Sequence, residues 1–185
     1  QDGINSSAYY RANGSSFYYS NSQLKPKLDT WYESNLKQYE KYIATSTYCE
    51  AARVRSGTAW NGINAPMALN TQYNPDFKCF IDGNGKGILT GKVGLISYDE
   101  LVYAGGYYYK ENSSVFLRNG KYFWTMSPYG TSSGGTAIWG LNPNGLVNGY
   151  YLGFESSLRP VISLNSNVTV EGAGTSSNPY VVQTN

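Results

Sequence analysis

The sequence contains no histidine and few charged residues. Asp, Glu, Lys and Arg make up 14% of its 185 residues, well below the roughly 25% typical of soluble domains. Without imidazole, Ser-His-Asp and Cys-His catalytic relays and His-ligated metal sites are excluded. A net charge of +2, carried by scattered Lys and Arg, offers no basic patch for DNA or RNA, so we expect no nucleic-acid partner.

Long apolar runs are absent as well. No stretch approaches the roughly 20 apolar residues that a membrane-spanning helix needs, so we expect no membrane insertion within this chain. No signal peptide is visible, but the chain opens at Gln1-Asp2-Gly3, and a leader removed before that point would leave no trace. The length fits one compact domain, which we place at 22–185 behind an N-terminal flank at 1–21.

Cysteine is scarce, with only Cys49 and Cys79 present. They lie too far apart for a redox Cys-x-x-Cys pair and are too few for a zinc site. A disulfide between them would close a loop of about 30 residues and stabilise the fold by roughly 3–4 kcal/mol. A charge-poor chain rich in Tyr, Ser, Asn and Gly is typical of a surface protein in an oxidising compartment, which favours the disulfide. Two buried free thiols are the alternative.

The N-terminal half predicts helix and then a long segment without periodicity. Ser22 can cap a helix that begins at about Gln23, and a second helical piece is expected over 39–44. The face of the first helix carries Leu24, Leu28, Trp31 and Asn35 at helical spacing, with Leu36 extending it. Between 49 and 91, turn signals replace periodicity. We assign Trp31, Trp60 and Trp124 to the core.

A strand, a helix cap and a short helix follow one another at 93–106. The apolar run 93–96 predicts a short buried strand. Ser97 and Glu100 fit a capping box, in which the Ser97 hydroxyl accepts from the Glu100 amide and the carboxylate reaches back. The helix then turns Leu101, Val102 and Ala104 inward, and the glycine pair at 105–106 ends it.

The C-terminal half predicts strands. They are expected at 121–126, ending at Ser127-Pro128, and at 136–141, 146–152 and 159–164, with a terminal hairpin of 168–170 and 180–182. The Asn144-Gly145 pair suits the turn of the middle hairpin. These elements predict an α+β fold in which a small twisted antiparallel sheet is flanked by two helices and long loops.

Several motifs in this order resemble a family of surface domains of gut Firmicutes, over roughly residues 22–183. They are the runs 93–100, 105–106, 124–128, 159–162 and 172–180. The family looks like a branch of the C-type-lectin-like fold and is related in shape to the formylglycine-generating enzymes. The helix around 28–32 and the cysteines Cys49 and Cys79 also match its layout. The resemblance implies that fold and a place on the bacterial cell surface, at the end of a pilin-like stem or beside immunoglobulin-like repeats.

The resemblance implies no activity. Formylglycine-generating relatives use cysteines near the C-terminus and iron-dependent relatives use a His triad, and this chain has neither. The segment Asn142-Pro143-Asn144 lacks the acidic ligands that calcium-dependent lectins of this fold use. Nothing brings Glu111 and Glu155 to glycosidase spacing. We therefore predict no catalytic residue, no metal and no cofactor.

Aromatic residues near the C-terminal strands are the most informative functional feature. They alternate with Ser, Gly, Thr and Asn, a mixture typical of binding surfaces, although packing in the core is the alternative for some rings. The candidate ligand-binding residues are Tyr107, Tyr108, Tyr129, Trp139, Tyr150, Tyr151 and Phe154, the first two from the run 107–109. Arg159 is expected to hold loop carbonyls or a carboxylate, with ligand binding as the alternative.

These observations predict a non-enzymatic extracellular recognition or adhesion domain. Its expected partner is a surface protein or a glycan of the host or of another bacterium. One alternative is a structural tip or subunit of a pilus or surface assembly, in which the aromatic face packs on a sister subunit. Another is a binding protein whose loops over 129–157 are diversified by a retroelement.

Overall fold

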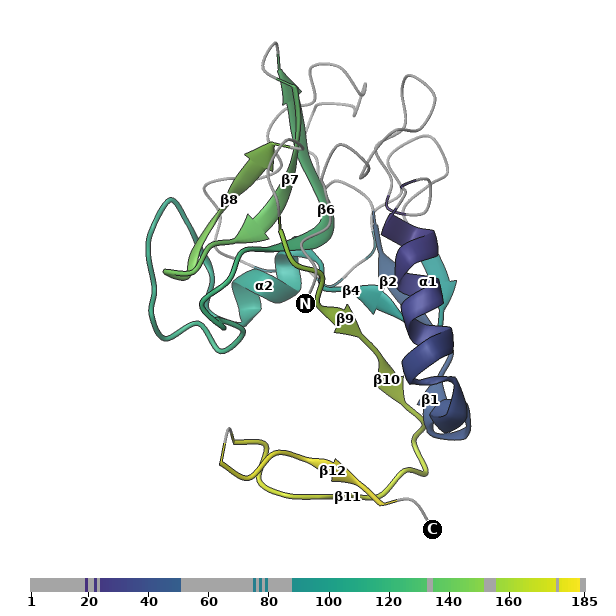
Figure 1. Ribbon diagram of the computed structural model, residues 1–185. Helices are drawn as coiled ribbons and strands as arrows, with labels where there is room; N and C mark the ends of the chain where they lie inside the picture. Colours follow the sequence, from purple (N-terminus) through teal and green to yellow (C-terminus); the bar gives the residue numbers. More distant parts are fainter. Residues whose placement is uncertain are drawn as a thin grey trace.

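A computed structural model describes the protein at Tyr19, Ser22, 24–50, Pro75, Phe77, Cys79, 88–132, 135–151, 156–175 and 177–183; at 128, 130–132 and 135–136 it describes the backbone only. Figure 1 shows the arrangement of the elements in space. In chain order they are α1 (Leu24–Asn35), the 3-10 helix η3 (Lys37–Tyr42), β1 (Ile43–Ala44), β2 (Ser46–Cys49), β3 (Ile88–Gly91), β4 (Gly94–Leu95), α2 (Tyr98–Tyr103), β5 (Tyr107–Tyr108), β6 (Phe123–Ser132), β7 (Gly135–Leu141), β8 (Leu146–Tyr151), β9 (Pro160–Val161), β10 (Ser163–Leu164), β11 (Val170–Glu171) and β12 (Val181–Val182).

The largest sheet has four strands in the order β5-β8-β7-β6. Its strands run antiparallel except for β5, which pairs parallel to β8. The other described pairings are the two-stranded ladders β1–β10, β2–β3, β4–β9 and β11–β12. The fold class is therefore α+β, built from small and mostly antiparallel sheets.

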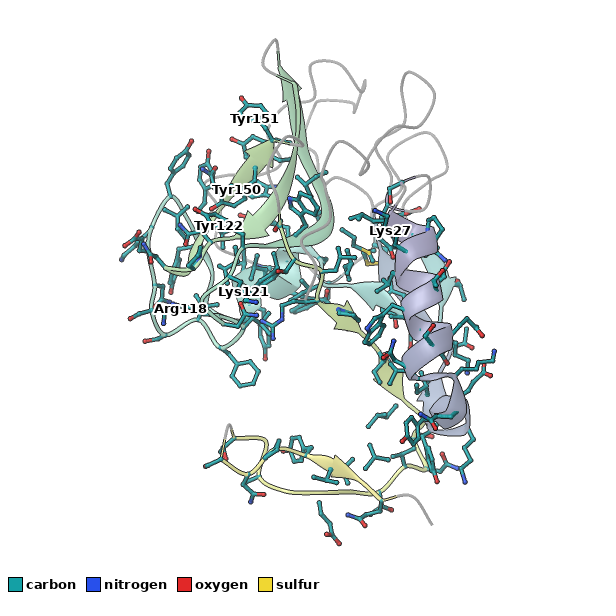
Figure 2. All side chains as sticks on the ribbon, viewed as in Figure 1. Lys27, Arg118, Lys121, Tyr122, Tyr150 and Tyr151 are labelled. Carbon is teal, nitrogen blue, oxygen red and sulfur yellow. A yellow bond between two sulfur atoms is a disulfide. The ribbon has the colours of Figure 1, made fainter. Side chains whose placement is uncertain are left out.

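Helix α1 packs one face on the body of the protein. Leu24, Leu28 and Tyr32, four residues apart, are buried, whereas Lys27 projects into solvent (Figure 2). The Ser22 hydroxyl accepts from the Lys25 amide at 3.3 Å at the start of the helix. The prediction that Trp31 belongs to the core is wrong: it is 39% exposed, because the buried stripe passes through Tyr32 instead.

The second predicted helical piece is only partly present. The chain forms η3 and then leaves the helix at β1, where Ile43 and Ala44 pair with Leu164 and Ser163 of β10. Just beyond this ladder, the Asn165 amide donates to the Tyr42 carbonyl at 2.8 Å. Pairing with a distant strand therefore outweighs the local helical pattern.

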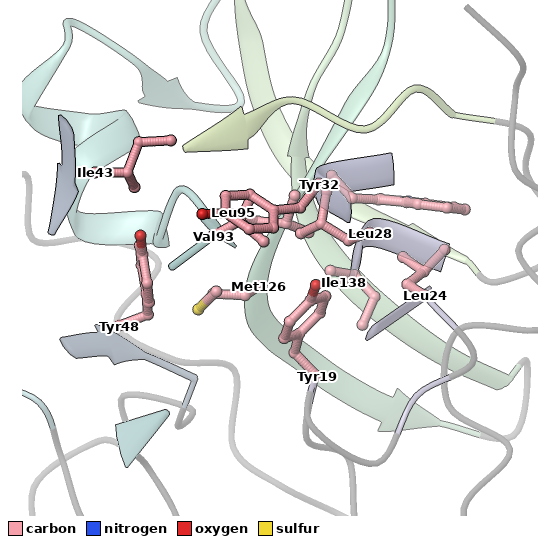
Figure 3. Packing of buried hydrophobic residues seen from close by; sticks show 11 residues of the cluster. Tyr19, Leu24, Leu28, Tyr32, Ile43, Tyr48, Val93, Leu95, Met126 and Ile138 are labelled. Carbon is pink, nitrogen blue, oxygen red and sulfur yellow. The ribbon is translucent and has the colours of Figure 1, made fainter. Parts of the chain in front are cut away.

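Two clusters of buried side chains fill the interior, and β7 lies between them. Ile138 belongs to the cluster that Figure 3 shows, together with Leu28 and Met126. Its neighbour Trp139 points the other way, into the cluster that contains Leu101 of α2. Successive strand residues face opposite sides of a sheet, so β7 is covered on both faces. The first cluster also includes Tyr19 and Trp124, the latter as predicted.

The capping box expected at the start of α2 is present. The Glu100 amide donates to the Ser97 hydroxyl at 3.2 Å, and the Ser97 amide donates to Glu100 Oε2 at 2.7 Å. Leu101 and Val102 are buried, and Gly105 leaves the helix at a φ of +96°, a conformation that suits glycine.

The disulfide between Cys49 and Cys79 is present, whereas the strands beside it were not predicted. Cys49 ends β2, which pairs along its whole length with β3, whereas the sequence predicts no regular structure over 88–91. A disulfide is typical of proteins outside the reducing cytoplasm. None of the helices in the described ranges is long and apolar enough to cross a membrane.

Two strand boundaries differ from prediction. Strand β6 does not end at Ser127-Pro128 but continues to Ser132, because the register shifts on either side of Pro128. Such a bulge accommodates a residue that has no amide hydrogen to donate.

The predicted strand 159–164 is two short strands, β9 and β10, which pair with β4 and β1. The terminal hairpin β11–β12 is confirmed, and Trp60 lies outside the described residues.

Removing the cap should weaken the fold measurably. We expect Ser97→Ala to lower the free energy of unfolding by about 1 kcal/mol, since the Glu100 amide loses its acceptor at the start of a six-residue helix. Urea unfolding followed by circular dichroism measures this, with the exposed Ser113→Ala as the control. Equal unfolding midpoints for the two variants would contradict the role of the cap.

Candidate functional site

Trp139 is the centre of an aromatic cluster. It has no exposed surface, and three tyrosine rings contact it. Tyr98 of α2 lies 4.2 Å away between ring centroids, and the rings of Tyr129 and Tyr108 meet it edge-on at 4.6 and 5.4 Å. The Trp139 indole nitrogen has no hydrogen-bond partner among the described residues, so ring packing is what holds this side chain.

Around this base lies a group of tyrosines that we call the tyrosine cluster: Tyr108, Tyr109, Tyr129 and Tyr151. The hydroxyls of Tyr108 and Tyr129 are hydrogen-bonded at 3.1 Å. Tyr109 packs edge-on against Tyr108, with 4.2 Å between ring centroids. Tyr151 of β8 lies opposite Ala137 of β7, so its side chain is on the same sheet face as Trp139. Tyr109 is 65% exposed and Tyr151 is 52% exposed, so these rings form the accessible part of the cluster.

Gly149 makes room for the cluster. It lies opposite Trp139 in the β7–β8 ladder, and the Tyr129 ring covers it. A Cβ atom at position 149 would lie 2.3 Å from Cγ of Tyr129, closer than real carbon atoms approach. The absence of a side chain here therefore sets the position of the Tyr129 ring over the sheet.

The backbone of Tyr109 is strained. With a φ of +54° it is the single non-glycine residue in the left-handed region among the described residues, and bulky side chains rarely adopt this conformation. Its amide donates to the Val147 carbonyl at 3.2 Å, which anchors the turn to β8. Residues held in this way cost about 1–3 kcal/mol and concentrate at binding sites.

Burial shifts the ionisation of the partly buried tyrosines. Burial first, and then the hydrogen bond with Tyr129, raises the pKa of Tyr108 far above its ordinary value of 10.0. Burial also raises the pKa of Tyr129. The hydrogen bond with Tyr108 lowers this pKa, whereas Tyr109 and Tyr151 raise it further. Both phenols are therefore neutral over the physiological pH range.

The structure separates the candidate residues into different environments. Tyr107 is partly exposed, with the Lys110 ammonium 5.7 Å from its ring. Tyr150 lies on the opposite sheet face from Tyr151 and packs edge-on against Tyr122, with 5.4 Å between ring centroids; Figure 2 labels the three residues. Burial raises the pKa of Tyr150 as well. Phe154 lies outside the described residues.

The assignment of Trp139 to the ligand-contacting set is corrected. We expected it at the surface beside the C-terminal strands, but it is fully buried in β7, which is covered on both faces. It supports the neighbouring rings and cannot itself touch a ligand.

Two members of the site were not among the candidates. Tyr109 belongs to the run 107–109, but its left-handed backbone leaves no mark in the sequence. Tyr98 follows the cap residue of α2, and only the packing of this helix on the sheet places its ring against Trp139. The one sequence feature that indicates Tyr98 is its position as an aromatic residue in the first turn of a capped helix.

Arg159 has a local structural environment. Its Nη1 donates to the carbonyl of Leu117, and its guanidinium lies 5.1 Å from the centroid of the Phe123 ring. Burial lowers the pKa of the guanidinium. A carbonyl is one of the partners expected for this side chain, and the Phe123 contact adds a cation–π interaction.

The described residues offer no group of side chains suited to holding a metal ion. No group of three His, Cys, Asp or Glu side chains in this part of the chain is placed to hold a metal ion. Glu111 accepts from the Asn144 side-chain amide at 2.7 Å, and Glu155 lies outside the described residues.

Comparison with protein-family models, curated proteins and solved structures finds no match to this chain. The resemblance to C-type-lectin-like surface domains therefore stays an expectation. A fold does not by itself define a function, so the chemistry of the tyrosine cluster must carry the functional argument.

Filling the space at position 149 should disrupt the cluster. We expect Gly149→Ala to lower the free energy of unfolding by about 1–3 kcal/mol, because the new methyl group displaces the Tyr129 ring. Gly91→Ala is the matched control, since its Cβ would meet only the Val93 carbonyl oxygen, at 3.7 Å. Urea unfolding compares the two, and similar costs for both would show that the Tyr129 ring does not depend on Gly149.

Stability should fall at alkaline pH. Because the folded pKa of Tyr108 lies above the unfolded value of about 10, the unfolded state binds fewer protons between these values. The free energy of unfolding is then at its full value below about pH 10 and decreases as the pH rises further. Urea midpoints measured at about pH 8 and about pH 11 test this, and Tyr108→Phe should show a smaller decrease than the unsubstituted protein. An equal decrease in both proteins would contradict the assignment.

Proposed function

We propose that this protein is a non-enzymatic recognition domain that binds a surface ligand through the tyrosine cluster. The observation that carries the proposal is the exposure of Tyr109 and Tyr151 beside a fully buried Trp139. Isolated exposed rings are common on proteins, but here Tyr109 packs against Tyr108, and Tyr151 lies on the same sheet face as Trp139. Tyrosine provides a large contact area with little conformational entropy to lose, and its hydroxyl hydrogen-bonds at the same time.

Rigidity supports the same function. The Tyr108–Tyr129 hydroxyl pair, the packing of Tyr129 over Gly149 and the backbone of Tyr109 each restrict a ring before any ligand arrives. A preorganised surface loses less entropy on binding, so more of the contact energy appears as affinity. A strained residue such as Tyr109 is consistent with a position maintained for binding.

The site of action that we propose is the bacterial cell surface. The Cys49–Cys79 disulfide supports a location outside the reducing cytoplasm. The resemblance to surface domains supports the more specific location, and the low charge of the chain is compatible with binding through aromatic contacts. Host or bacterial surface molecules are the corresponding ligands.

A second candidate function is a structural subunit of a surface assembly. It is favoured by the β11–β12 hairpin, which extends away from the α1 and β6–β8 regions (Figure 1) and exposes Val170, Val181 and Tyr180. A hairpin of two strands gains little stability by itself, and exposed apolar residues on it suit packing against another molecule. Light scattering distinguishes the candidates, because assembly requires a stable oligomer and recognition does not.

Removing either exposed ring should weaken recognition without unfolding the protein. On an array of glycans and surface proteins, we expect Tyr109→Ala and Tyr151→Ala each to weaken binding by about tenfold or more. Tyr180→Ala is the matched control, since this tyrosine is 64% exposed on the separate hairpin. Binding that survives both cluster substitutions, or that is lost equally in Tyr180→Ala, would contradict the proposal.

A further inference from the structure

We infer that Asn119 is a site of spontaneous modification, at which the side-chain amide becomes a carboxylate through a cyclic imide formed with the Gly120 nitrogen. Asparagine followed by glycine suits this reaction, because glycine has no side chain beside the attacking nitrogen. Six Asn-Gly pairs occur in the sequence, and those that begin at 119, 144 and 148 lie in the described parts of the chain. The inference does not depend on the recognition function proposed above.

The reaction balances without a cofactor or an oxidant. The Gly120 nitrogen loses its proton and forms a bond to Cγ of Asn119, and the side-chain nitrogen leaves as ammonia. Water then opens the imide at one of its two carbonyl carbons, which yields aspartate or isoaspartate. The reaction therefore requires an accessible amide nitrogen, a side chain free to turn toward it, and a backbone free to rotate about the Cα–C bond that becomes part of the ring.

The Asn119–Gly120 pair meets these requirements. Both residues are exposed, and they lie between β5 and β6, outside any helix or strand. The Gly120 amide donates to no described residue, and a Cβ atom at this position would meet no described atom within 4 Å. The backbone here can rotate without breaking a strand ladder.

The side-chain amide of Asn119 is also poised for the attack. The Lys121 amide donates to Asn119 Oδ1 at 3.2 Å. Negative charge develops on this oxygen when the Gly120 nitrogen attacks Cγ, so the Lys121 amide stabilises the intermediate. The side-chain nitrogen that must leave is not held by any described residue.

The pair that begins at Asn144 lacks these freedoms. Asn144 Nδ2 donates to Glu111 Oε1 at 2.7 Å. The Gly145 amide donates to the Asn142 carbonyl at 3.0 Å. Gly145 is buried, and a Cβ atom there would overlap the Asn112 carbonyl oxygen. Ring closure would have to break both hydrogen bonds, one of them to a charged carboxylate, in a closely packed turn.

The pair that begins at Asn148 is restrained by β8. Asn148 lies opposite Gly140 in the β7–β8 ladder, and Gly149 lies opposite Trp139. Closing the ring fixes the rotation about the Cα–C bond of Asn148, so the extended backbone would have to leave the ladder. The Tyr129 ring also covers Gly149. The Gly149 amide donates to Asn148 Oδ1 at 2.8 Å, but the strand prevents this approach from leading to a ring.

The product changes the charge of one surface turn. Asn119 follows Arg118 and precedes Lys121 by two residues, and both cationic residues are labelled in Figure 2. A carboxylate at 119 lowers the formal net charge of the chain from +2 to +1 and accepts more strongly from the Lys121 amide. The isoaspartate product instead adds a methylene group to the backbone shortly before β6. The protein therefore becomes a mixture of forms as it ages.

The test follows the three pairs in one sample. The full chain is incubated at mildly alkaline pH, both folded in buffer and unfolded in guanidinium chloride, and peptide mass spectrometry locates each exchange of an amide for an acid. In the folded protein, we expect Asn119 to react about tenfold or more faster than Asn144 and Asn148. In the unfolded chain the three should react at similar rates, since glycine follows each of them.

Asn119→Gln is the matched variant. Its longer side chain would have to close a larger ring, so the fast reaction at this position should be lost while Asn144 and Asn148 behave as before. A reaction at Asn144 or Asn148 that is as fast as at Asn119 in the folded protein would overturn the inference. So would an unmodified Asn119 in folded protein incubated as long as an unfolded sample in which all three have reacted. Circular dichroism confirms that the sample in buffer stays folded.

Discussion

The packing of Trp139 against tyrosine rings is the interaction on which the recognition surface depends. Trp139 lies in β7, between the two buried clusters, so its ring is fixed by the core on one side of the sheet. Tyr108 and Tyr129 rest on that ring, and Tyr109 rests on Tyr108. The exposed Tyr109 ring is thus connected to the core through Tyr108, and a movement of that ring would disturb this contact.

Several local features cooperate to maintain this arrangement. Gly149 leaves the space that the Tyr129 ring fills, and a hydrogen bond to β8 holds the left-handed turn at Tyr109. The Tyr108 and Tyr129 hydroxyls are hydrogen-bonded to each other, and burial raises the pKa of both phenols. Within the tyrosine cluster, ring packing and the hydrogen bond between the Tyr108 and Tyr129 hydroxyls are the contacts that position the side chains.

The sequence predicts well those features that depend on neighbouring residues. The Ser97–Glu100 cap and the β7–β8 turn follow from residue types a few positions apart. The β2–β3 ladder could not be predicted in this way, because its strands meet only through the fold. The same limit applies within the site. Tyr150 and Tyr151 look equivalent in the sequence, but the strand register places them on opposite faces, and Trp139 is buried because α2 covers its face of β7.

The central claim is that Trp139, which is buried and does not touch the ligand, determines how tightly the ligand binds. The direct measurement is the affinity of Trp139→Phe for the array ligand that the unsubstituted protein binds most tightly, with folding verified by circular dichroism. A smaller ring withdraws support from Tyr108 and Tyr129, so the account predicts that the folded variant binds at least about tenfold more weakly. Unchanged affinity in a folded variant would show that the exposed tyrosines are positioned independently of Trp139, and the account would be wrong.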